Sequence, residues 1–77
     1  MASTDTIVQK RQFGHLAQKW ANIQLELQIM QSAAGYYIGT QTPEGMPCSR
    51  ESENYYPTRE AADTALADDS WIQRKEP

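Results

Sequence analysis

The chain has 77 residues, with one cysteine, one histidine and a formal net charge of −3 at pH 7. A chain of this length forms one domain at most and buries a modest core, so small domains often need a disulfide, a metal or a partner chain. The single Cys48 excludes an intramolecular disulfide, and one Cys with one His cannot complete a four-ligand zinc site. We therefore expect no cofactor and no metal, and a partner chain is the leading remaining source of stability.

The negative charge is concentrated in the second half of the chain. Residues 1–34 carry three basic and two acidic side chains, whereas residues 35–77 carry four basic and eight acidic ones. An acidic half repels phosphate, so direct nucleic-acid binding is not expected. The N-terminus lacks the pattern of a secretion signal, and no stretch approaches the ~18 consecutive apolar residues of a membrane span. We expect a cytoplasmic protein without a membrane contact.

Residues 6–34 predict a long amphipathic helix. The segment has no proline and is rich in Gln, Ala, Leu, Ile and Lys, and the preceding STDT stretch offers an N-cap. Gly35 is expected to end the helix in a left-handed conformation. Apolar residues recur at alternating spacings of three and four, as in a heptad seam: Phe13, Leu16, Trp20, Ile23, Leu27, Met30 and Ala34. This seam packs on the protein's own C-terminal half, on a second copy or on a partner.

Leu25 and Ile29 lie one turn apart on another side of this expected helix. A two-layer fold places polar residues there, so these two side chains indicate either a second, partner-binding face or a helix set deeper in the core.

Residues 35–77 have the composition of a sheet with a second helix. Residues 35–54 predict a β-hairpin around a TPEG turn, residues 58–67 a short helix capped by Thr58, and residues 70–74 a final strand. The predicted fold is α+β, as one domain over residues 1–77. Its long N-terminal helix packs on a small, mostly antiparallel sheet of about three strands, with a short helix in the C-terminal half.

The sequence carries no catalytic signature. Cys48 and His15 are far apart in the chain, and the glycines form neither GxGxxG nor GxxxxGK[ST]. Glu51 and Glu53 are expected on one face of a strand and Asp68 and Asp69 are adjacent, but their spacing is not that of a calcium loop. We therefore predict that the protein is not an enzyme.

The two tyrosine pairs favour recognition. In a strand, neighbours point to opposite faces, so one tyrosine of each pair can cover the helix while the other is exposed. Exposed tyrosines beside arginine and carboxylates are typical of protein-binding surfaces. The candidate partner-binding residues are Leu25, Ile29, Tyr36, Tyr37, Glu51, Glu53, Tyr55, Tyr56, Asp68 and Asp69.

Residues 35–74 also carry a resemblance. GYYIGT, then Gly45 and Pro47, then SRES, YY, a T-x-E helix start and a closing W-x-Q-R resemble short uncharacterised proteins of bacteria and their phages. The resemblance implies a compact unit from a bacterial or phage source, and it implies no activity and no functional residue.

We therefore predict a small protein-binding module, encoded by a phage or another mobile element, that inhibits a host complex stoichiometrically in the host cytoplasm. By analogy from size and acidity, the anti-CRISPR type of inhibitor is the most specific form. It blocks a surface through Leu25, Ile29 and exposed tyrosines, or it mimics nucleic-acid charge with its carboxylates: Glu44, Glu51, Glu53, Glu60, Asp63, Asp68 and Asp69. The alternatives are a homodimeric structural or adaptor protein zipped through the N-terminal helix, and a small nucleic-acid-binding regulator.

Overall fold

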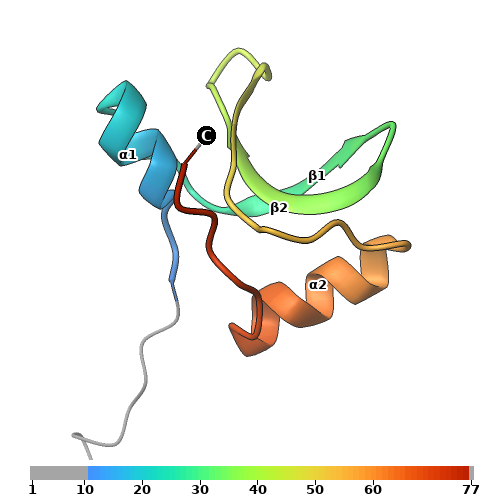
Figure 1. Ribbon diagram of the computed structural model, residues 1–77. Helices are drawn as coiled ribbons and strands as arrows, with labels where there is room; N and C mark the ends of the chain where they lie inside the picture. Colours follow the sequence, from blue (N-terminus) through green and yellow to red (C-terminus); the bar gives the residue numbers. More distant parts are fainter. Residues whose placement is uncertain (1–10, 77) are drawn as a thin grey trace, which may run out of the picture.

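The computed structural model describes residues 11–76 as an α+β fold of two helices and three strands. The order along the chain is α1 (His15–Ala21), β1 (Gln28–Ser32), β2 (Gly35–Gln41), β3 (Pro47–Arg50) and α2 (Arg59–Asp68). The strands form one antiparallel sheet in the order β1-β2-β3. Figure 1 shows β1 and β2 as a curved pair, with α2 along one side and α1 near one end.

The predicted long N-terminal helix is wrong. Within the described residues, only His15–Ala21 of that segment are helical. The helix ends at Asn22, whose φ of 56° is left-handed. The Asn22 N–H donates to the Gln18 carbonyl and the Ile23 N–H donates to the Ala17 carbonyl. The chain then runs extended into β1, which occupies residues assigned to the helix. The predicted N-cap and first turn lie in residues 1–10, outside the described residues.

The physical reason is a period of two that competes with the heptad pattern. From Ile23 to Ile29 apolar and polar residues alternate strictly, and the apolar ones are half-buried while Gln24 and Glu26 are exposed. The extended segment pairs with the residues before α1. Gly14 N–H donates to the Leu25 carbonyl at 2.9 Å, and Leu27 N–H donates to the carbonyl of residue 12 at 2.8 Å. There is thus no helical seam and no second helical face bearing Leu25 and Ile29.

Two hairpins build the sheet. β1 and β2 meet at Ser32 and Gly35, so Gly35 (φ 130°) shapes a strand turn and not a helix end. β2 and β3 form the hairpin expected in residues 35–54, with an irregular register between Thr40 and Gln41. In place of the expected final strand over 70–74, the structure has a single bridge between Ser52 and Gln73.

The core lies between the sheet and α2. Ile38, Ala65 and Trp71 are buried together, with four partly buried side chains around them: Leu27, Ile29, Tyr56 and Leu66. α2 coincides closely with the helix expected over 58–67, and the Thr58 hydroxyl accepts the Ala61 N–H at 3.1 Å as its cap. The local capping signal therefore gave the right helix start.

The two faces of the sheet have different neighbours. Ile29 pairs with Ile38, and this face meets α2; Thr40 extends it to Gly14 at the start of α1. The next residues along each strand point the other way, as Met30 does opposite Tyr37. Both described helices therefore contact the face of Ile38, and neither covers the face of Tyr37.

Replacing Gly35 by Ala tests the turn between β1 and β2. A Cβ at Gly35 would lie 2.9 Å from the Tyr56 carbonyl oxygen, on a backbone with φ of 130°. Gly45 also has a positive φ, of 89°, but a Cβ there meets nothing within 4 Å, so Gly45→Ala is the matched control. We expect Gly45→Ala to cost about 1–2 kcal/mol through its backbone alone and Gly35→Ala about 1–3 kcal/mol more, in chemical denaturation. Equal losses would contradict the close approach of the turn to Tyr56.

Candidate functional site

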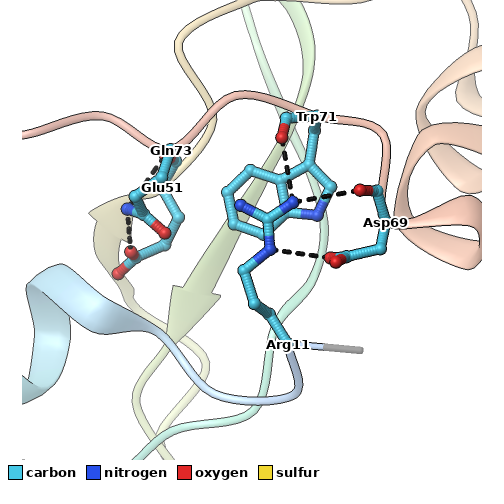
Figure 2. Close-up of polar contacts among 5 residues, drawn as sticks. All are labelled: Arg11, Glu51, Asp69, Trp71 and Gln73. Carbon is cyan, nitrogen blue, oxygen red and sulfur yellow. Dashed lines mark hydrogen bonds and ion pairs between the residues drawn. The ribbon is translucent and has the colours of Figure 1, made fainter. Parts of the chain in front are cut away.

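A buried carboxylate joins three parts of the chain. Glu51 is 0% exposed, and its two oxygens accept hydrogen bonds from the start of α1, from the nearby Ser49 and from Gln73. The backbone N–H groups of Leu16 and Ala17 lie 2.9–3.1 Å away, the Ser49 hydroxyl 2.6 Å away and the Gln73 amide nitrogen 2.7 Å away. Figure 2 shows the Gln73 amide directed at this carboxylate.

Glu51 acts as the missing cap of α1. The N-cap residue, Gly14, has no side chain to accept a hydrogen bond, and the first turn holds no acidic residue. Leu16 and Ala17 are the second and third residues of the helix, whose N–H groups a capping side chain normally satisfies. The Glu51 charge also lies at the positive end of the helix dipole. A Cβ on Gly14 would lie 2.6 Å from Glu51 Oε2, so glycine leaves the room that the carboxylate occupies.

The hydrogen bonds keep Glu51 ionised. Burial alone raises the pKa of its carboxyl group, but the bonds from Leu16, Ser49, Gln73 and Ala17 together lower this pKa below its ordinary value. Its oxygens are engaged inside the protein, which leaves no role in proton transfer to an external group. Glu51 therefore belongs to the fold, and we leave it out of the partner-binding surface.

A second cluster ties the start of the described chain to the end of α2. Arg11 Nε donates to Asp69 Oδ1 at 2.7 Å, and Arg11 Nη2 donates to the carbonyls of Asp69 and Trp71 at 3.2 and 2.9 Å. The guanidinium centre lies 3.9 Å from the centre of the Trp71 ring. Figure 2 looks onto the ring, with the guanidinium stacked over its face. Asp69 is thus the left-handed C-cap of α2 and an ion-pair partner at once. Its charge is used internally.

A cavity of about 400 Å³ opens beside this cluster. It lies between the extended segment before β1 and the last turn of α2. Its lining residues are Arg11, Gln12, Glu26, Leu27, Leu66 and Ala67.

The face of the sheet opposite α2 carries an ordered stack of aromatic and cationic groups. The rings of Tyr37 and Tyr55 meet edge to face, with centres 5.8 Å apart and an interplanar angle of 82°. The Arg50 guanidinium lies over the Tyr55 ring, 4.5 Å from its centre. Burial, with a smaller contribution from Tyr55, raises the pKa of Tyr37, while Arg50 opposes this. We call this surface the outer sheet face; it comprises Gln28, Met30, Tyr37, Arg50 and Tyr55.

The tyrosine pairs behave differently from one another. Tyr55 is 39% exposed, whereas its neighbour Tyr56 packs on the core. Tyr37 is buried beneath Tyr55, and Tyr36 is half-buried and exchanges backbone hydrogen bonds with Tyr56. Of the four tyrosines, Tyr55 is therefore the one that offers a large exposed ring surface.

The remaining candidate residues do not gather at one place. Ile29 packs against the core and Leu25 is half-buried in the extended segment. Glu53 is exposed beside the C-terminal segment, where its N–H bonds to the Ile72 carbonyl, and Asp68 is exposed in the last turn of α2.

The sequence reading missed several residues that organise these clusters. Arg11 and Gln73 act over distances of 58 and 22 residues along the chain, for which no local pattern exists. It also missed the exposure of Trp20 (58%), because the heptad spacing placed this side chain in the apolar seam.

Residues 11–76 contain no cluster of three or more His, Cys, Asp or Glu side chains able to hold a metal ion. Neither described helix has the length and apolar character needed to cross a membrane. No family model, curated protein or solved structure matches the chain. The resemblance to short bacterial and phage proteins accordingly stays a prediction.

Replacing Glu51 by Gln tests the internal cap. The variant keeps the side-chain shape but loses the charge and turns an N–H₂ group toward donors, so we expect it to lose about 2–4 kcal/mol of unfolding free energy at pH 7. Because the pKa is lowered by folding, the charge stabilises the protein fully above the unfolded value of about 4.3. This contribution disappears as the pH falls through the lower folded pKa. Urea unfolding from pH 7 to pH 2.5 should therefore show the two proteins converging below about pH 4; a constant difference would contradict the ionised cap.

Replacing Arg11 by Lys tests the second cluster. Lysine keeps the charge but cannot donate along three directions while stacking flat on Trp71, so we expect a loss of about 1–2 kcal/mol in thermal or chemical unfolding. Lys19→Arg, at an exposed position, provides the control for exchanging the two cations. Full stability of Arg11→Lys would show that charge alone holds the cluster.

Proposed function

We propose that the protein is a non-enzymatic protein-binding module that contacts its partner through the outer sheet face. One observation carries the proposal: the stack of Arg50 on Tyr55 and of Tyr55 on Tyr37, on a face that neither described helix covers. Tyrosine and arginine are among the residue types that contribute most to binding energy in protein interfaces. A partner that covers this stack completes the layer missing from this side of the sheet.

The stack is already ordered before binding. Tyr55 is held between the Tyr37 edge and the Arg50 guanidinium, and Tyr37 is 8% exposed. Association normally costs about 0.5–1.5 kcal/mol for each flexible side chain that becomes immobile. Part of this cost is absent here because folding has already fixed the rings.

The chemistry of the stack indicates what the partner presents. Stacking occupies one flat side of the Arg50 guanidinium, and no hydrogen bond of this side chain occurs within residues 11–76. Its N–H edges suit a carboxylate, which can bind them in a bidentate manner. We therefore propose a partner surface with an acidic side chain next to an apolar or aromatic pocket for Tyr55.

The inhibitor role of such a module is part of the proposal. A small acidic protein that occupies the surface of a larger bacterial complex fits a stoichiometric, phage-encoded inhibitor in the host cytoplasm. Surface blocking is favoured over charge mimicry, because two of the seven carboxylates considered for mimicry, Glu51 and Asp69, are engaged internally.

Two other functions find less support. A homodimer zipped through a long helical seam needs a helix that is absent from residues 11–34 as the structure describes them. A nucleic-acid regulator needs converging cations, but Arg11 is paired with Asp69, Lys19 lies near Trp20 and Arg50 stacks on Tyr55.

A capture experiment tests the proposal. The tagged protein is incubated with bacterial lysate, captured proteins are identified, and the affinity for the purified candidate is measured by calorimetry at low and high salt. We expect one-to-one binding that Arg50→Ala with Tyr55→Ala weakens by at least about 30-fold, corresponding to about 2 kcal/mol. Because apolar contact dominates, raising the salt concentration should change the affinity only a few-fold.

Met46→Ala is the matched control, because Met46 is 63% exposed in the turn after β2 and lies outside the outer sheet face. It should bind like the wild type. Equal binding by the double variant, with its fold intact by circular dichroism, would refute the outer sheet face as the binding surface.

A further inference from the structure

The outer edge of β1 presents backbone groups that no described residue binds. Consecutive residues of a strand direct their N–H and C=O groups to alternate sides. The groups of Leu25 and Leu27 turn toward residues 12–14, with which they bond. Ile29 and Gln31 turn the same way, and within residues 11–76 no strand pairs with their backbone groups.

The cavity of about 400 Å³ lies at one end of this edge, where the pairing with Gln12 begins. Leu27, Leu66 and Ala67 give it an apolar floor. Arg11 stands at its rim with Nε and Nη2 bonded to Asp69 and Trp71, while Nη1 makes no hydrogen bond within the described residues. The cavity can therefore take an apolar side chain and donate a hydrogen bond to a backbone carbonyl beside it.

The flank of the edge is acidic. α2 packs against β1, and its residue Ala67 lines the cavity. Asp63 and Glu60 lie four and seven residues before Ala67, which places them on the same side of the helix. Glu26 adds a carboxylate at the cavity, and the one ion pair among the described residues, Arg11 with Asp69, involves none of these three. The single basic residue of α2, Arg59, leaves this flank negative.

We propose that the outer edge of β1 binds an extended, basic segment of a partner protein as an added strand. Backbone hydrogen bonds to Ile29 and Gln31 hold the segment, an apolar side chain of the segment fills the cavity, and its basic side chains face Glu26, Glu60 and Asp63. Addition of a strand to an exposed edge is a common mode of peptide recognition, in which the backbone supplies affinity and pockets supply specificity. This edge is separate from the outer sheet face, and binding there does not depend on Tyr55.

The probe, called the lysine–valine peptide, is an acetylated and amidated nonapeptide that is titrated into the 77-residue protein and followed by NMR. One valine and four lysines occupy its odd positions, so that in a strand they share the face toward α2, and threonine occupies its even positions. We expect saturable shifts of the Ile29 and Gln31 amide resonances and at least fivefold slower hydrogen exchange of both amides at saturation. A nonapeptide with glutamate in place of lysine should bind at least tenfold more weakly. So should a lysine–valine peptide N-methylated at alternate residues, which cannot donate to the edge.

Two pairs of variants locate the contact. Gln31→Pro removes an outward N–H and should weaken binding at least tenfold, whereas Gln31→Ala keeps this N–H and should bind like the wild type. Ala67→Trp fills the cavity and should weaken binding at least fivefold, whereas Met46→Trp places the same ring in the exposed turn after β2, away from the cavity, and should change little. If Gln31→Pro does not fold, the N-methylated peptide still decides the question of backbone pairing.

Several results would overturn the proposal. These are equal binding of the N-methylated or the glutamate peptide, unchanged binding by Ala67→Trp, and no binding of the lysine–valine peptide at millimolar concentration. Slow exchange of the Ile29 and Gln31 amides in the free protein would mean that the edge is already covered. If dilution restores fast exchange, a second copy covers the edge; if it does not, this chain itself covers it. Arg50→Ala with Tyr55→Ala should bind the probe normally, which separates failure here from failure of the outer sheet face.

Discussion

The buried Glu51 carboxylate is the constraint on which the rest of this fold depends. It joins the start of α1, the end of the β2–β3 hairpin and the C-terminal segment through hydrogen bonds to Leu16, Ala17, Ser49 and Gln73. A buried charge without a cationic partner is tolerable only if strong donors replace the lost water. Two of these donors are backbone N–H groups of α1. The first turn of α1 therefore needs the Glu51 carboxylate as an acceptor, and the buried carboxylate needs these N–H groups as donors.

This mutual dependence explains how a helix of seven residues persists in the fold. Isolated helices shorter than about 12–15 residues are marginal in water, and α1 has no capping side chain of its own. Glu51 gives the first turn its acceptors, and burial of Leu16 and Ala17 supplies the packing. The Arg11 cluster performs a similar task at the end of α2, to which it fastens the chain segment before α1. Both tie-points lie away from the outer sheet face, which is left free of helices.

How much of this structure the sequence could predict depended on the range of the interaction involved. The Thr58 cap, the helix after it and the hairpin of residues 35–54 follow from neighbours in the chain, and each is present. In the segment from Ile23 to Ile29, only Ile23 and Leu27 fit the apolar positions of the heptad, whereas every residue fits a strict alternation of apolar and polar side chains. Leu25 and Ile29, which the helical reading had to place on a second face, were the signal of the strand. The Glu51 cap had no such signal, since its donors lie 34 and 35 residues away.

The internal pairing of these charged side chains also bears on function. Catalysis by a side chain needs a reactive group that is poised but not already engaged, and the buried carboxylate of this protein has its acceptors taken by four residues of its own chain. Asp69 is likewise held by Arg11. The binding surfaces proposed among residues 11–76 are an aromatic and cationic stack on one face of the sheet and a strand edge with an acidic flank that no described residue pairs with. Each presents a shape and a charge on which the proposed protein binding rests, and the two lie on different sides of β1. The two proposals together therefore describe a module that holds a partner at two points, one of which, the stack, folding has already ordered.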